Sequence, residues 1–133
     1  MTTALTRILC IDDETDILEI AKMALEAVGG YTVKTCNRSV ESIEAAQAFG
    51  PDLILLDVMM PGLDGAATLK LLKADAALAH IPVIFMTAKV QPSETAHYLE
   101  LGAVGVIAKP FDPMALPDEV KRLWQRYHTE NRT

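Results

Sequence analysis

Short apolar runs and longer segments of helical period alternate five times along the chain. The short runs are rich in β-branched and aliphatic residues, and between them apolar residues recur every three or four positions, as in helices that bury one face. The alternation predicts an α/β protein with a parallel sheet and crossover helices. The expected strands are 7–11, 31–35, 52–57, 81–87 and 105–108.

The third run, 53–56, is continuously apolar, so its strand is expected to be covered on both faces in the middle of the sheet. Because crossovers are right-handed, five βα units predict a doubly wound, flavodoxin-like (βα)5 sheet with strand order 2-1-3-4-5. Binding sites in such sheets lie beyond the carboxyl ends of the strands, where the strand order reverses.

Polar residues before the helical segments are candidate N-caps. They are Thr15, Ser39, Asp64, Ser93 and Asp112. Pro117 would lie about one turn into the fifth helix, where a missing backbone N–H removes a hydrogen bond. It therefore predicts a bend or a late start of that helix.

The chain has 133 residues, 50% of them hydrophobic, which suits a single domain over 1–133 with a core at about 7–127 and a frayed tail at 128–133. The net charge of −6 offers no broad basic surface, so no direct nucleic-acid partner is expected. No apolar stretch approaches the roughly 18 residues that span a bilayer, and the first residues lack the apolar region of a signal peptide. We therefore expect no membrane partner and a cytoplasmic location. Cys10 and Cys36 lie in apolar runs and are expected to be reduced core residues.

Chemically active side chains follow four of the five expected strands. They are Asp12 and Asp13 after the first, Asp57 at the end of the third, Thr87 after the fourth and Lys109 after the fifth. If the first and third strands are neighbours, three carboxylates share one crevice. Two of them at about 4 Å repel by roughly 4 kcal/mol at an effective dielectric of 20. Either one acid is protonated with a raised pKa, or a cation lies between them.

Hard oxygen ligands without a nearby histidine or thiolate favour Mg²⁺ over Zn²⁺, and Mg²⁺ commonly accompanies phosphoryl groups. Asp57 is the candidate nucleophile, because it ends the most buried strand and a carboxylate can accept a phosphoryl group. Mg²⁺ and Lys109 would neutralise charge on that group, and the Thr87 hydroxyl would donate a hydrogen bond to its oxygens.

Each residue also has a plainer interpretation. A strand-end aspartate is commonly a turn residue, residues 12–14 could form a solvated acidic loop, and Thr87 and Lys109 taken singly would be a cap and a surface lysine. The coincidence of all of them at successive strand ends favours a functional site. The histidines, at positions 80, 97 and 128, lack the spacing of metal ligands.

Four motifs, spread over residues 7–125, resemble the receiver domain of two-component response regulators, the family of the bacterial chemotaxis regulator. The motifs are Ile11-Asp12-Asp13-Glu14, Asp57-Val58-Met59-Met60-Pro61-Gly62-Leu63-Asp64-Gly65, Met86-Thr87-Ala88 and Lys109-Pro110-Phe111. They occur in the family's order and with its spacing.

The resemblance implies that Asp57 accepts a phosphoryl group from a phosphohistidine on a sensor histidine kinase or a histidine phosphotransfer protein. It further implies that Asp13, Asp57 and the backbone carbonyl of Met59 bind Mg²⁺, with Asp12 acting through water. Thr87 and Lys109 would contact the phosphoryl oxygens. The domain would catalyse its own phosphorylation and hydrolysis as a signalling protein rather than a metabolic enzyme, and the family also has a cis peptide before the proline at 110.

By the same resemblance, the output is a contact with a downstream protein target through the fourth helix, fifth strand and fifth helix, a surface that could also form a homodimer. Val106 stands where the family often has an aromatic switch residue. Switching is therefore expected to use backbone shifts at 87–89 and repacking around Tyr98. The composition leaves open whether the chain is a stand-alone regulator or part of a longer one.

Three alternatives differ in class. A degenerate receiver would keep the fold as a phosphorylation-independent protein-binding module, although all the site residues are intact. An aspartate-nucleophile phosphatase needs a second aspartate two positions after Asp57, where Met59 stands. A flavodoxin needs a Ser, Thr and Gly loop after the first strand to hold the FMN phosphate, which residues 12–14 would repel.

Overall fold

Five parallel strands form one sheet in the order β2-β1-β3-β4-β5, which confirms the predicted order. The computed structural model describes residues 4–130 of the chain. The strands are β1 (Arg7–Ile11), β2 (Thr32–Cys36), β3 (Leu53–Asp57), β4 (Val83–Thr87) and β5 (Gly105–Ala108). Their bounds differ from the predicted ones by at most two residues.

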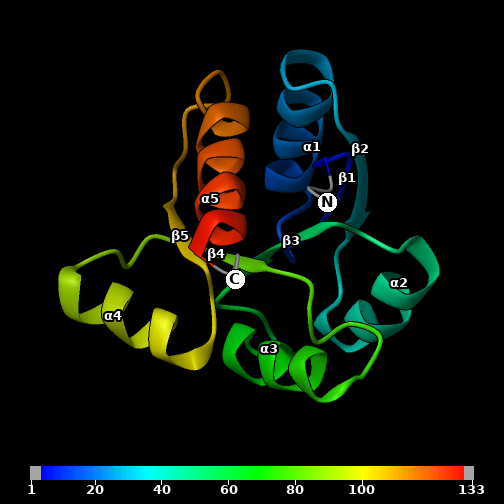
Figure 1. The fold of residues 1–133 in the computed structure, drawn as a ribbon, viewed down its shortest axis with the longest axis vertical. Helices are drawn as coiled ribbons and strands as arrows, with labels where there is room; N and C mark the ends of the chain where they lie inside the picture. The colour runs from blue at the N-terminus through cyan, green and yellow to red at the C-terminus, as the bar shows by residue number, and fades with distance from the viewer. Residues whose placement is uncertain (1–3, 131–133) are drawn as a thin grey trace.

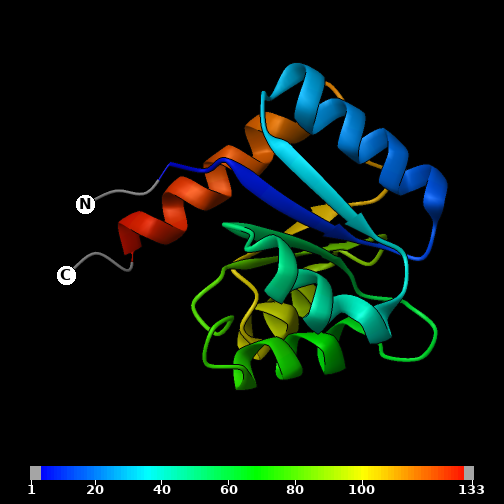
Figure 2. The same ribbon diagram turned by 90° about the vertical axis from the view of Figure 1, so that its right-hand side faces the viewer.

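Helices cover both faces of the sheet and complete three layers (Figures 1 and 2). One face carries α1 (Thr15–Met23), its π-helical continuation η1 (Ala24–Val28) and α5 (Leu116–Glu130). The opposite face carries the 3₁₀-helix η2 (Ser39–Glu41), α2 (Ser42–Phe49), α3 (Gly65–Ala74) and α4 (Pro92–Leu101). The doubly wound arrangement predicted from the alternation is confirmed.

Strand β3 lies at the centre of the sheet and is buried along its whole length. Leu55 faces the apolar layer under α1 and α5, whereas Ile54 and Leu56 face the layer under α2, α3 and α4. Burial on both faces explains the unbroken apolar run, because no position of this strand meets water. Asp57 therefore ends a strand that is fixed from both sides.

The helix caps were predicted less well than the elements. Asp64 does cap α3, since its Oδ1 accepts the Ala67 N–H at 2.8 Å. The predicted caps Thr15 and Ser93 are wrong, because α1 begins one residue earlier, and α4 two residues earlier, than those caps require. The predicted cap Ser39 is also wrong, because its hydroxyl bonds to a distant loop.

The start of α5 confirms the expected effect of Pro117. Asp112 heads a turn instead of a helix: its carbonyl accepts the N–H groups of Ala115 and Leu116, both at 3.0 Å. The helix begins at Leu116, so Pro117 occupies its second position, where the missing N–H costs little.

Helix α5 continues to Glu130, so residues 128–130, expected in the frayed tail, are helical. The rest of that predicted tail, 131–133, lies outside the described residues. Across residues 4–130, none of the helices is both long and apolar enough to cross a membrane. The Lys109–Pro110 peptide is cis, as the resemblance implied.

Candidate functional site

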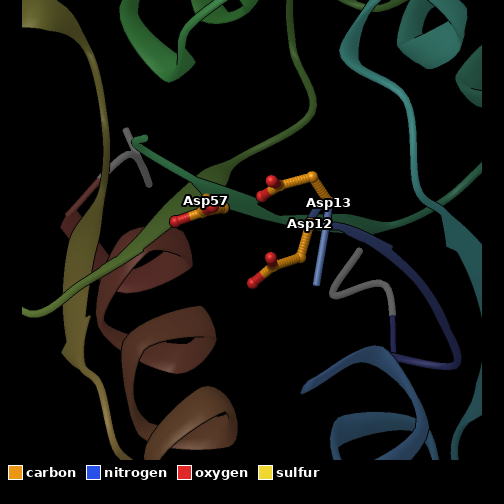
Figure 3. A group of neighbouring side chains, drawn as sticks. All are labelled: Asp12, Asp13 and Asp57. Carbon is orange, nitrogen blue, oxygen red and sulfur yellow. The ribbon is translucent and has the colours of Figure 1, made fainter. Parts of the chain in front are cut away.

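Three carboxylates meet beyond the carboxyl ends of β1 and β3, where the strand order reverses (Figure 3). Asp12, Asp13 and Asp57 each place a carboxylate oxygen within 4.8 Å of the others. Asp12 and Asp57 are buried and Asp13 is exposed. The predicted convergence of these acids is confirmed.

Sheet pairing explains the convergence. Ile11 of β1 lies beside Leu56 of β3, so the residues that follow them come side by side at the same edge. The backbone N–H of Asp12 donates to the carbonyl of Cys36 on β2 at 3.1 Å. Its side chain is fixed as well, because Oδ1 accepts the N–H of Glu14 at 2.9 Å.

Lys109 brings one positive charge between the two buried acids. Its Nζ donates to Oδ2 of Asp12 at 2.8 Å and to Oδ1 of Asp57 at 3.2 Å. Its backbone N–H donates to the carbonyl of Thr87 at 2.9 Å, which extends the pairing of β4 and β5 to the site. The third partner of the ammonium is Glu14, with Oε1 at 3.4 Å. No role was predicted for Glu14, although it lies in the acidic run and in the first family motif.

Burial raises the pKa of Asp57 from 3.8 to about 6, and the negative charge of Asp12 adds to this rise. Lys109 and a backbone hydrogen bond from Met59 oppose it. Burial would lower the pKa of Lys109, but its hydrogen bonds and charge interactions with Asp12 and Asp57 raise it overall. Of the two alternatives anticipated from sequence, a cation lies between the acids, and it is Lys109 of the protein itself. The raised pKa of Asp57 brings its protonation closer to neutral pH.

The predicted Thr87 is buried at the end of β4. Its Oγ1 accepts the backbone N–H of Lys89 at 3.1 Å, which leaves the hydroxyl proton available for donation. The backbone of Met59 lies close enough to hydrogen-bond Asp57, while its side chain is exposed. The roles of Thr87 toward a phosphoryl group and of the Met59 carbonyl toward a metal stay predictions.

The donor set fits a hard divalent cation. All the clustered ligand atoms are carboxylate oxygens. One ammonium pairs with three acids, which are Asp12, Glu14 and Asp57, and Asp13 adds a fourth carboxylate. Within the described part of the chain, no salt bridge involves Asp13. The cluster therefore retains excess negative charge beside an exposed carboxylate, as a Mg²⁺ site requires.

Two aromatic side chains pack together beside Val106, the position where the family often has an aromatic switch residue. Val106 on β5 lies beside Phe85 on β4. The buried Tyr98 of α4 packs edge-on against Phe85, with ring centroids 5.4 Å apart and planes at 83°. This layer thus has aromatic side chains from β4 and α4, and none from position 106 of β5.

The fold and the site together define a class: a flavodoxin-like α/β domain with an acidic, lysine-paired site at its topological switch point. Residues 8–121 match the family model described as the response regulator receiver domain. The chain belongs to this family, so it is the receiver domain of a two-component response regulator. Aspartate phosphorylation and Mg²⁺ binding are general features of the family, and receiver domains interact with histidine kinases. Neither the family match nor the intact site favours the degenerate alternative.

Similar proteins include longer regulatory proteins and solved receiver structures. The alkaline phosphatase synthesis transcriptional regulatory protein PhoP of Bacillus subtilis is 37% identical over 120 residues, which are 90% of this chain and 49% of that protein. The DNA-binding response regulator MtrA of Mycobacterium tuberculosis is 32% identical over 130 residues, 98% of this chain and 55% of that protein. The chain therefore spans about half the length of these relatives.

Among solved structures, the chemotaxis response regulator CheY4 of Vibrio cholerae superposes with a TM-score of 0.83 at 27% identity, covering 90% of this chain and 99% of that one. The N-terminal domain of a response regulator receiver protein from Methanoculleus marisnigri is 34% identical with a TM-score of 0.73, covering 98% and 99% of the two chains.

Proposed function

We propose that Asp57 accepts a phosphoryl group from a phosphohistidine on a sensor histidine kinase or a histidine phosphotransfer protein. The observation that carries the proposal is the pairing of Asp57 with Lys109 inside the three-carboxylate cluster, 3.2 Å from Oδ1 to Nζ. A rigid strand end aims this carboxylate into the crevice, and the cluster supplies oxygen ligands for a cation beside it.

In the transfer step, a carboxylate oxygen of Asp57 forms the new P–O bond while the P–N bond to the donor imidazole breaks. The imidazole leaves with the electron pair and takes a proton from solvent. By the family resemblance, Asp13, Asp57 and the Met59 carbonyl would hold Mg²⁺, and Asp12 would act through water. Bound there, Mg²⁺ supplies charge neutralisation for the phosphoryl oxygens.

The chain's own side chains bind the remaining phosphoryl oxygens. Lys109 stays at the site through Asp12 and donates from its ammonium, and the buried Thr87 hydroxyl donates its free proton. Hydrolysis returns the domain to its starting state: water attacks phosphorus, the P–O bond to Asp57 breaks, and the products are the carboxylate and inorganic phosphate.

The output is a change in the face formed by α4, β5 and α5. Movement of the backbone at 87–89 toward the phosphoryl group alters the packing of Tyr98 on Phe85, which links the site to α4. Helix α4 exposes the apolar side chains of Leu99 and Leu101. It serves a downstream protein target or a homodimer.

Incubation with acetyl phosphate and Mg²⁺, followed by intact mass, tests the proposal. The parent should gain one phosphoryl unit, and either EDTA or Asp57→Asn should abolish the gain. An unmodified parent would instead favour a phosphorylation-independent binding module, and equal modification of Asp57→Asn would remove Asp57 from its role.

A further inference from the structure

The loop that carries Met59 is held at its middle by a side chain from another part of the chain. This loop, residues 58–64, joins β3 to α3. The hydroxyl of Ser39, on η2, donates to the carbonyl of Pro61 at 3.1 Å and accepts the N–H of Leu63 at 3.0 Å. One hydroxyl therefore uses both its donor and an acceptor site on the same loop.

The ends of the loop have their own anchors. The N–H of Val58 donates to the carbonyl of Met86 at 3.2 Å, and the N–H of Gly65 donates to the carbonyl of Val58 at 2.8 Å. Between these anchors lies Gly62 with a φ of +86°. The two Ser39 bonds bracket this glycine, the one position in the loop where the backbone takes the left-handed conformation.

Ser39 lies close in sequence to the end of β2, which also positions Asp12. It follows β2 by three residues, and the carbonyl of Cys36 at the end of β2 accepts the N–H of Asp12 at 3.1 Å. The thiol of Cys36 donates to the carbonyl of Arg38 at 3.2 Å. The loop is thus tied to the same strand end that positions Asp12.

The bonding of Ser39 is not that of a helix cap. Its partners lie 22 and 24 residues away, and the N-cap position of η2 belongs to Arg38, which makes no side-chain cap bond. The side chain is buried, with 3% of Ser39 exposed, so water cannot readily replace a lost hydroxyl.

From these contacts we infer that Ser39 is a positioning residue, which holds the loop so that the Met59 carbonyl binds the divalent cation. The inference rests on the proposed function, since it assigns Met59 as a ligand. Met59 lies two residues before Pro61, and Mg²⁺ accepts only small departures from octahedral geometry. Residues that orient metal ligands without touching the metal commonly change affinity about tenfold or more when removed.

Ser39→Ala is the test, and Ser42→Ala is its matched control. Ser42 is three residues away and fully buried, yet its hydroxyl has no hydrogen-bond partner among residues 4–130. Titration calorimetry should show Mg²⁺ binding weakened about tenfold in Ser39→Ala, unchanged in Ser42→Ala and near the parent value in Ser39→Thr. Hydrogen exchange of the Leu63 amide should accelerate in Ser39→Ala alone.

Two failures are distinguishable. A parent that binds no Mg²⁺ would overturn the metal site of the proposed function and this inference with it. If the parent binds Mg²⁺ and a folded Ser39→Ala binds it with the same affinity, the positioning role alone is overturned, even if the variant lost stability. If Ser39→Ala does not fold, Ser39→Cys retains the side-chain volume with weaker hydrogen bonding, and the same comparison applies.

Discussion

Lys109 and Asp12 are 97 positions apart in the chain, yet the lysine Nζ lies 2.8 Å from Oδ2 of a fully buried aspartate. This pair sets the electrostatics of the site, because the same ammonium also reaches Asp57 at 3.2 Å. A buried carboxylate pair is thereby held together before any cation or phosphoryl group arrives.

Removal of that ammonium should destabilise the domain. Lys109→Ala leaves two buried carboxylates without their partner, and breaking a buried ion pair typically costs about 3–5 kcal/mol. Urea unfolding at pH 7 in EDTA measures the loss. Glu14→Gln is the control: its carboxylate is largely exposed at 3.4 Å from the ammonium, so the change should be below about 1 kcal/mol. Equal stability of Lys109→Ala and the parent would contradict the role of the pair.

Asp57→Asn should stabilise the metal-free domain at neutral pH. The pKa of Asp57 is raised to about 6 in the fold, so the folded state binds the proton more tightly than the unfolded chain. The charged form therefore destabilises the fold, and stability falls as pH rises from about 4 through about 6.

The substitution should gain about 3 kcal/mol at pH 7 and nothing below pH 4, measured by urea unfolding in EDTA across this range. Glu100→Gln, which removes an exposed acid on α4, is the control for the loss of one negative charge at the surface. A gain that is constant with pH would show that the charge of Asp57 is not its origin.

Asp13 should determine the response to Mg²⁺. At 100 times its dissociation constant, a ligand of the folded state raises stability by about 2.7 kcal/mol. The parent should show such a rise in thermal unfolding, and Asp13→Asn should lose most of it because an exposed ligand is removed. Asp16→Asn, an exposed acid in the first turn of α1, should respond as the parent does. Identical Mg²⁺ responses in all three proteins would place the cation elsewhere.

Gly65 should be required for the shape of the site. A Cβ at this position would lie 2.7 Å from Cα of Val58 and 2.8 Å from the carbonyl oxygen of Asp57, both backbone atoms. Gly65→Ala must therefore displace the end of β3, with a loss of about 1–3 kcal/mol and weaker Mg²⁺ binding by calorimetry.

Gly105→Ala is the matched control for Gly65. The three atoms nearest to its Cβ would all belong to the side chain of Leu123, the closest at 2.8 Å, and that side chain can move. It should lose stability while keeping the Mg²⁺ affinity of the parent. Unchanged Mg²⁺ affinity in Gly65→Ala would show that the site tolerates movement of this backbone.

Sequence reasoning succeeded where a long-range rule applied. Asp12, Asp13 and Asp57 could be brought together because parallel strands end at one edge and the fold rule names the edge where binding sites lie. Pro117 predicted the late start of α5 because a missing N–H acts locally, whatever surrounds it.

It failed where a side chain had a choice of partner. Ser39 had the residue type of a cap, but its hydroxyl bonds Pro61 and Leu63, which no local rule can identify. Glu14 was named in an acidic run and in a family motif but was given no role, since its approach to Lys109 depends on side-chain conformations across the crevice.

The most direct measurement identifies the residue that carries the phosphoryl group. The domain is treated with acetyl phosphate and Mg²⁺ and then reduced with borohydride, which converts an aspartyl phosphate to homoserine and leaves free carboxylates intact. Peptide mass spectrometry should find homoserine at position 57 and aspartate at positions 12 and 13. Homoserine at 12 or 13 with aspartate retained at 57 would contradict the assignment of Asp57 as the phosphoryl acceptor.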